Sequence, residues 1–340
     1  MFLNTELFGH QRGASNRGYK KIKYGTMVLS TQNLHLGNAN VNLRFKHGMV
    51  SPAYKTYDIT GCSIELLAHW IKSDAAKHFF YNATTVGASM CRRNVEWETL
   101  YEQPLFLPSP DEQDKIASIL SILAQRIDVQ QKYVAALKKY KRGLNHKLLS
   151  EIDEQYNREL GTVCSIVGGG TPDTLRPEYW EGNVEWFTPS EIGKSKYVLS
   201  SLRKISQVGL SNSSAKSLPS GTVLLTTRAT LGEMSIARSE CSTNQGFQSL
   251  VSDSKRVLPE YLYYLQILIK PWCEKYASGN TFREISKASL SKCVVPVPCL
   301  NSQKRIVCIL SRIEELIETH ERVEDSLTQI KEGLLQQLFI

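Results

Sequence analysis

The chain has 340 residues, a formal net charge of +8 and a pI of about 9.0, and hydrophobic residues make up 41% of it. This length is typical of two domains, the hydrophobic content is sufficient for packed cores, and the basic balance favours an anionic partner. The N-terminus has no charged-then-apolar signal and no apolar run reaches membrane-spanning length, so we expect a cytoplasmic protein.

The first part of the chain, residues 1–108, is expected to form a small mixed domain. Residues 1–20 are typical of a loop or arm, and a short strand from Met27 to Ser30 follows a turn at Gly25. Further short strands are predicted up to Asp58. Residues 63–80 carry apolar side chains at helical spacing, and a proline-rich PLFLPSP segment closes the region.

The next part, residues 109–150, is predicted to be one long helix. Its apolar residues recur at alternating spacings of three and four, with polar Gln130 and Lys141 in the same series, as in a coiled-coil seam. About 38 helical residues span roughly 57 Å, which is too long for a small domain to bury the seam. The apolar seam positions are 116, 120, 123, 127, 134, 137, 144 and 148.

Residues 151–298 are predicted to form a second, larger globular domain. Three consecutive glycines at 168–170, followed by Thr171-Pro172, indicate a loop. Strand and loop material follows, and PEYLYYLQILIKPWCEKYA is predicted to be a helix. Two prolines, Pro296 and Pro298, then lead into a second long helix in residues 299–340.

The two long helical stretches are internal repeats, because 111–149 aligns without a gap onto 301–339. The first holds eight Lys or Arg against four acids, and the second five against seven, which favours pairing of the two copies with each other. The alternative is that both are surface helices of separate domains. The expected second seam is 306, 310, 313, 317, 323, 327, 330, 334 and 338, with a phase shift near His320.

The two globular regions also repeat each other. The segment GTMVLST from Gly25 matches GTVLLTT from Gly221, and Arg93 matches Arg283. The second region holds about forty residues, 158–196, without a counterpart in the first. We therefore expect the second region to be the competent ligand-binding module and the first to be shorter and less stable, with an exposed sheet edge.

The long helices carry a motif that resembles a known family. Both begin after prolines, with EQDKIASILS in the first copy and SQKRIVCILS in the second, where Ser302 replaces the glutamate. This pattern, and the GGGTPDT segment, resemble the specificity subunit of type I restriction-modification systems. The resemblance extends over essentially the whole chain, and the first domain looks like a target recognition domain shortened at its front.

The resemblance implies an α+β protein with two target recognition domains and two conserved helices that form an antiparallel coiled coil. Each domain of such a subunit binds half of a bipartite double-stranded DNA sequence, the helices dock methyltransferase subunits, and an ATP-driven nuclease and translocase subunit joins the complex. The implied role is DNA recognition without catalysis. The alternative is a truncated remnant that acts only as a coiled-coil scaffold.

The enzyme motifs in the sequence are weak. Ser51-Pro52-Ala53-Tyr54 is close to an amino-methyltransferase motif, but its third residue is Ala, and a turn at a strand edge is the better interpretation. Gly193-Lys194-Ser195 lacks the first glycine of a phosphate-binding loop, because position 188 is Thr. The eight cysteines include no CxxC pair and no metal-ligand spacing with histidines, so we expect reduced thiols, no metal and no cofactor.

Basic and amide side chains are the candidate DNA contacts, because Arg and Lys neutralise phosphates or read guanine, and Asn and Gln suit adenine. For any single one, a solvated surface residue is the favoured interpretation, and as a set they are plausible DNA-facing groups. The basic run Lys138, Lys139, Lys141 and Arg142 is better explained as a solvated helix face than as a contact. The candidates are Arg92, Arg93, Lys194, Lys196, Arg203, Lys204, Arg228, Asn244, Gln245 and Arg283.

Overall fold

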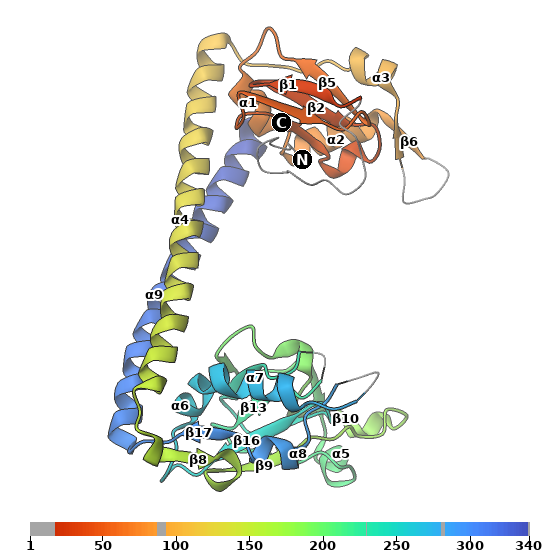
Figure 1. Cartoon of the computed structure of the whole chain (residues 1–340). Helices are drawn as coiled ribbons and strands as arrows, with labels where there is room; N and C mark the ends of the chain where they lie inside the picture. The colour runs from red at the N-terminus through yellow and green to blue at the C-terminus, as the bar shows by residue number, and fades with distance from the viewer. Residues whose placement is uncertain (1–17, 87–92, 229, 280–282, 339–340) are drawn as a thin grey trace. The chain divides into compact units, whose positions relative to one another are not determined.

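The computed structural model describes residues 18–86, 93–228, 230–279 and 283–338 (Figure 1). The chain divides into two compact units. Unit 1 comprises the residues up to 135 together with those from 319 onward, and unit 2 comprises residues 136–318. We call the globular part of unit 1, residues 18–108, the first module, and the globular part of unit 2, residues 151–298, the second module.

Two long helices, α4 (Pro110–Ser150) and α9 (Leu300–Leu338), contribute segments to both units. Helix α4 begins at a proline, whose missing N–H costs nothing in the first turn. Glu112 accepts hydrogen bonds from the backbone N–H and the hydroxyl of Ser109, at 3.0 and 2.7 Å, which fixes the helix start. The predicted apolar seam positions of α4 are all buried or half-buried.

The two helices run antiparallel and pack against each other within each unit. In unit 1, Nε2 of Gln130 donates to the carbonyl oxygen of His320 at 2.8 Å. In unit 2, Nζ of Lys141 lies 2.5 Å from Oε1 of Glu314. The two polar positions of the α4 seam therefore meet polar partners on α9, and the seam continues through them without a break. The coiled-coil arrangement expected from the repeat is confirmed.

The phase shift expected near His320 is wrong. Val323 and Ile330 are 43% and 53% exposed, whereas Leu335 is only 7% exposed. His320 is half-buried, and its Nδ1 lies 2.8 Å from Nε2 of Gln130. A polar residue therefore occupies the seam at this position. The regular three-and-four spacing runs on through 313, 317, 320, 324, 327, 331 and 334.

The first module is a three-stranded antiparallel sheet in the order β3-β2-β5, covered by α1 (Ile64–Trp70) and α2 (Asp74–Asn82). Alternating side chains of the central strand point into a core with Leu34, Trp70 and Phe80. Ser63 and Ser73 cap the two helices by accepting from the N–H groups of Leu66 and Ala76. The strands are β2 (Thr26–Ser30), β3 (Ala39–Val41) and β5 (Tyr54–Asp58), with short ribbons β1 (Lys20–Lys23) to β4 (His47–Val50) and β6 (Thr84–Val86) to β7 (Arg93–Val95), then α3 (Trp97–Glu102).

The second module contains the same framework with additional strands. Its five-stranded sheet has the order β11-β14-β13-β16-β9, in which β14-β13-β16 corresponds to β3-β2-β5 of the first module. Strands β9 (Cys164–Gly168) and β10 (Trp180–Phe187) come from the segment that has no counterpart in the first module. The remaining strands are β8 (Asn157–Glu159), β11 (Tyr197–Val198), β12 (Arg203–Ile205), β13 (Val223–Leu225), β14 (Met234–Ala237), β15 (Cys241–Thr243), β16 (Gln248–Ser252) and β17 (Val294–Pro296).

Four short helices complete the second module, namely α5 (Gln207–Ser211), α6 (Pro259–Tyr264), α7 (Gln266–Tyr276) and α8 (Lys287–Ser291). Its main core joins α6 and α7 to Leu149 of α4 and to Ile306 and Leu310 of α9. The long helices are thus part of the hydrophobic core of this unit, and not appendages to it.

A buried glutamine attaches each module to a long helix. In unit 1, Gln113 accepts from the N–H of Ser63 at 2.8 Å and donates to the carbonyl of Pro108. In unit 2, Gln303 accepts from the N–H of Leu258 at 2.9 Å. It also donates to the carbonyls of Arg256 and Pro298, each at 2.8 Å. Each glutamine therefore binds the backbone at the N-cap of a module helix, Ser63 before α1 and Leu258 before α6.

Candidate nucleic-acid interface

Four loops of the second module are fastened together at one end of its sheets, and we call them the loop cluster. Their described residues are 168–171, 187–190, 226–228 with 230, and 243–246. The N–H of Gly170 donates to the carbonyl of Thr243, and that of Thr227 to Gly246, both at 2.8 Å. The N–H of Asn244 donates to the carbonyl of Phe187 at 3.1 Å. These backbone bonds give the cluster a defined shape, as a recognition surface requires.

Two of the three consecutive glycines, Gly169 and Gly170, allow close approach of this loop to neighbouring backbone. A side chain on Gly169 would lie 2.0 Å from the carbonyl oxygen of Asn244, and one on Gly170 would lie 2.2 Å from Oγ of Ser214. Only glycine fits such positions, because any Cβ atom would collide with backbone. The GGGTPDT segment is therefore explained by packing of the loop against its neighbours.

Three predicted DNA contacts, Arg228, Asn244 and Gln245, lie in the loop cluster. The Arg228 guanidinium pairs with Oε2 of Glu284 at 2.9 Å and keeps 43% of its side chain exposed. Oδ1 of Asn244 accepts from the N–H of Gly246 at 2.8 Å, and Gln245 is exposed and accepts from the Thr171 hydroxyl. Charged and amide groups are thus held together on one surface. Hydroxyl groups of Thr188, Ser190 and Thr230 belong to the same cluster, and no pattern in the sequence points to them.

The loop cluster lies at the end of β13 opposite to the attachment of the long helix. Gly221, just before β13, lies beside Pro259 at the start of α6, where Gln303 of α9 binds the neighbouring Leu258. The strand runs from there towards Arg228. Within unit 2, the polar loops therefore face away from the helix attachment and are accessible to a large ligand.

The matched arginines Arg93 and Arg283 occupy equivalent positions in the two modules. Nη2 of Arg93 donates to the carbonyl of Thr84 at 2.7 Å, and Nη2 of Arg283 donates to the carbonyl of Glu274. Arg93 also lies over the ring of Tyr81, at 4.1 Å from its centroid. Arg93 thus fastens β7 to β6, and Arg283 fastens its segment to α7. Arg92 lies outside the described residues.

The candidates of the 194–204 stretch are dispersed. Lys194 is exposed, whereas Lys196 points to α9 and pairs with Glu314 at 3.1 Å. Arg203 stacks over Trp180 at 3.7 Å, and Lys204 pairs with Glu185 at 2.6 Å on the other sheet. These lysines and arginines do not form one basic patch with the loop cluster.

Lys196 belongs to a polar network that joins the second module to both helices. Its Nζ donates to the hydroxyl of Tyr264 at 2.7 Å, and Glu314 accepts from Lys141, Lys196 and Tyr264. Burial alone would raise the pKa of Glu314, but the hydrogen bonds and charges of these partners outweigh it and hold the pKa below its usual value. Burial, followed by the bond to Glu314, raises the pKa of Tyr264, so this hydroxyl remains protonated.

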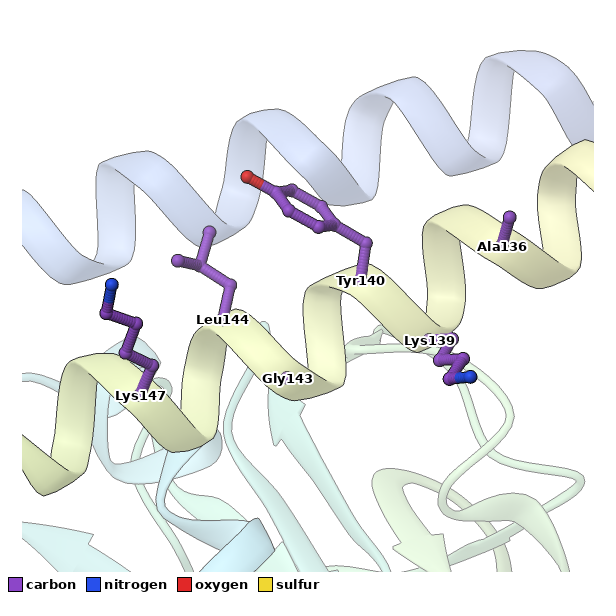
Figure 2. Close-up of a pocket in the computed structure, with 6 residues that line it drawn as sticks. All are labelled: Ala136, Lys139, Tyr140, Gly143, Leu144 and Lys147. Atoms are coloured by element: carbon purple, nitrogen blue, oxygen red, sulfur yellow. The ribbon is translucent and has the colours of Figure 1, made fainter.

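A groove of about 550 Å³ lies along the exposed side of α4 in unit 2 (Figure 2). At its centre, Gly143 has no atom near the position of a missing side chain, and Tyr140 is 60% exposed. The repeat places Gly333 of α9 at the same register, also with open space, next to Ile330, which is 53% exposed. Neither glycine is required by packing within the chain. The groove is lined by Ala136, Lys139, Tyr140, Gly143, Leu144 and Lys147.

The weak enzyme motifs have structural explanations. Ser51 to Tyr54 forms a turn before β5, closed by a 3.1 Å hydrogen bond from the N–H of Tyr54 to the carbonyl of Ser51. The N–H of Gly193 donates to Oγ of Ser235. Across the described ranges, no three His, Cys, Asp or Glu side chains gather in a way that could hold a metal ion. None of the helices in those ranges has the length and apolarity needed to cross a membrane.

The fold and the sequence are similar to known proteins. Residues 152–329 match the family model described as the type I restriction modification DNA specificity domain. The MjaIX specificity subunit of a type I restriction enzyme from Methanocaldococcus jannaschii is 32% identical over 187 residues, which is 54% of this chain and 43% of that one. The putative MjaX specificity subunit of the same organism is 24% identical over 99% of this chain and 78% of its own length.

A solved structure has the same fold. It concerns complex assembly and conformational transition of the type I restriction-modification system, and it superposes with a TM-score of 0.62 at 21% identity. The superposition covers 96% of this chain and 84% of that one. The protein is thus an α+β chain with two globular modules and two long helices. The chain belongs to the type I restriction modification DNA specificity domain family, and the relatives described above are named as specificity subunits.

Proposed function

We propose that this chain is the DNA-reading, non-catalytic specificity subunit of a type I restriction-modification complex. In this proposal it binds a bipartite double-stranded DNA target. The first target recognition domain is residues 1–108 and the second is 151–298, with spacer helices in 109–150 and 299–340. The observation that carries the proposal is the loop cluster, a fastened group of polar and cationic loops facing away from the long helices in unit 2.

DNA contact by the second module is supported by the chemistry of that surface. Arg228, Asn244 and Gln245 offer donors and acceptors for base edges, and exposed hydroxyl groups surround them. Lys194 and Arg203 are the exposed cations suited to phosphates farther along the duplex. Lys196, Lys204, Arg93 and Arg283 make internal contacts, and we assign them to positioning of the interface.

The partners in this proposal are methyltransferase subunits, bound along α4 and α9. The support is the pair of repeat-related glycines, Gly143 and Gly333, which leave open notches beside exposed Tyr140 and Ile330. A glycine in the middle of a helix costs about 1 kcal/mol relative to alanine, so an external reason for it is expected. Two equivalent notches suit two copies of one partner. The nuclease and translocase subunit joins through that complex.

The proposal is tested with the full chain bound to its methyltransferase subunit. The complex should select a bipartite sequence from a random DNA library and methylate it with S-adenosylmethionine. The isolated chain should methylate nothing. A complex that binds all DNA sequences equally, or an isolated chain that transfers methyl groups, would contradict the assignment.

A further inference from the structure

The two modules carry different side chains at two positions that match in the alignment of the repeats. In the second module, Arg228 follows the GTVLLTT strand and pairs with Glu284 at 2.9 Å. In the first module, Gln32 follows the matching GTMVLST strand at the same offset and forms an antiparallel bridge with Asn94. Asn94 matches Glu284 in the alignment that joins Arg93 to Arg283. The aligned positions therefore hold Arg and Glu, joined by an ion pair, in the second module, and Gln and Asn, on backbones that form a β-bridge, in the first.

Both pairs are at the end of the sheet that faces away from the long helix of their own unit. In unit 1, Gly25 at the start of β2 lies against Ile64 of α1, next to Ser63, which binds Gln113 of α4. Gln32 follows the opposite end of that strand. Gln32 and Asn94 are both exposed, and Arg228 and Glu284 keep 43% and 34% of their side chains exposed. Each pair is thus presented where its module is open to a ligand.

The two pairs have the donor and acceptor patterns of two different base pairs. In the major groove, Arg donates to O6 and N7 of guanine and a carboxylate accepts from N4 of cytosine, so Arg with Glu matches a G·C pair. Gln and Asn each match N6 and N7 of adenine. Building on the proposed DNA-reading function, we propose that Arg228 and Glu284 specify a G·C pair in one half of the target, and that Gln32 and Asn94 specify an A·T pair in the other.

A purely structural role explains the Arg228–Glu284 pair less well. An ion pair this exposed adds little to stability, typically less than about 1 kcal/mol. The carboxylate of Glu284 also accepts from the hydroxyl of Thr227, which orients it beside the guanidinium. The carboxylate also lowers the net positive charge at this site, which disfavours a phosphate and favours a base edge as the ligand of the remaining N–H groups. In the first module, the hydrogen bond from the N–H of Arg93 to Oδ1 of Asn33 fixes the neighbouring backbone.

The test exchanges the pairs in the full chain bound to its methyltransferase subunit. Arg228→Gln with Glu284→Asn should replace one required G·C pair by A·T in a single half of the selected sequence. Gln32→Arg with Asn94→Glu should do the reverse in the other half. Discrimination at that base pair should change by about 5- to 150-fold, while the other half-site stays as it was. Selection from a random library followed by sequencing gives both readouts.

Controls separate this inference from the broader proposal. Asp128→Asn with Lys132→Gln removes an exposed ion pair on α4 and should leave both half-sites unchanged. Arg228→Lys retains the charge but loses bidentate geometry, and should lower the preference for guanine about tenfold or more even if the exchanged variants fold poorly. An unchanged recognition sequence in the exchange variants would overturn the inference alone. A wild-type complex without sequence preference would overturn both it and the proposed function.

Discussion

The two modules use the same framework and differ at its edges and polar end. Both place a central strand, β2 or β13, after a glycine with positive φ, Gly25 or Gly221. The second module then adds β9 beside β16, and the described part of the first has no strand in the corresponding place beside β5. The repeat therefore preserves how a module folds and attaches to the helices, whereas the ligand-facing parts are free to differ.

The attachment to the long helices is similar in kind but different in charge. In unit 1, His69 lies 3.2 Å from the hydroxyl of Ser121, and in unit 2 Tyr264 lies 3.1 Å from that of Ser311, the repeat partner of Ser121. Lys141 in unit 2 pairs with Glu314. In unit 1, Lys331 is the repeat partner of Lys141, and Ala124 is the repeat partner of Glu314. Unit 1 therefore has a methyl group where unit 2 has the carboxylate. Unit 1 therefore relies on neutral histidine where unit 2 relies on an ion pair.

The largest expected effect on the free energy of unfolding comes from the two buried glutamines, Gln113 and Gln303. Gln303→Ala leaves one N–H and two carbonyl groups without partners and should lower the free energy of unfolding by about 3 to 4 kcal/mol. Gln113→Ala removes two such bonds and should cost about 2 kcal/mol. Urea denaturation of both variants measures the difference. Equal losses would mean that the attachments contribute equally in the two units.

Substitution with Met gives the control for shape. Gln303→Met keeps the length of the side chain but removes the acceptor and the amide donor without adding a buried charge, so it should fall between wild type and Gln303→Ala, which also loses packing. If it were as stable as wild type, the three hydrogen bonds of Gln303 would contribute nothing to stability.

Long-range periodicity and the repeat were readable from the sequence, and the polar contacts were not. The seam of α4 was predicted because apolar spacing reports one helix face. The prediction of the α9 seam is wrong beyond His320, because polar residues at 320, 324 and 331 hide the apolar periodicity. The polar residue at 320 is explained by its contact with Gln130 of α4, which the sequence does not show. The loop cluster could not be derived, since four distant loops meet through backbone bonds that depend on no particular side chain. The alignment pairs Arg93 with Arg283, and it does not reveal that each donates to a backbone carbonyl of its own module.

A pH titration should distinguish the two units next. Burial, and then the charge of Lys331, lower the pKa of His69 to about 4, against 6.5 when unfolded. Above pH 6.5 the ring is neutral in both states. As the pH falls from 6.5 to 4, the unfolded state gains a proton that the folded state resists, so unit 1 should lose about 1 to 2 kcal/mol, the partial burial of the ring limiting the effect. Glu314 has a lowered pKa, so unit 2 should lose its contribution only below the usual range for glutamate.

Hydrogen exchange of α1 and α6 across this pH range provides the measurement. Protection of residues 64–70 should fall between pH 6.5 and 4, while that of residues 259–264 stays constant. His69→Asn removes the titrating group, so the fall in α1 should disappear in this variant. A parallel fall in both helices would show that the acid response does not originate at His69.

A smaller effect is expected at the two helix glycines. Gly143→Ala and Gly333→Ala should each raise the free energy of unfolding by about 1 kcal/mol, because both positions have room for a methyl group and alanine favours the helix. Each substitution should at the same time weaken binding of the methyltransferase subunit, measured by calorimetry. Ala135→Gly, at an exposed position of the same helix, is the reverse control, with lower stability and unchanged binding. If the variants were more stable and bound the methyltransferase subunit as tightly as wild type, the two glycines would not belong to the partner surface.

The smallest effect tests the segment that only the second module has. Lys194 is exposed, and Lys194→Ala should reduce the slope of log affinity against log salt by about 0.9 if it contacts one phosphate, with stability unchanged. Lys196→Ala is two residues away and removes the ion pair to Glu314, so it should lower stability and leave the salt slope as in wild type. Affinity of the methyltransferase-bound complex for its target, measured over a salt series, separates the two lysines. If Lys196→Ala changed the salt slope and Lys194→Ala did not, Lys196 would be the residue of this turn that contacts DNA, contrary to the proposal. The additional segment would then serve recognition through the residue that here fastens the second module to α9.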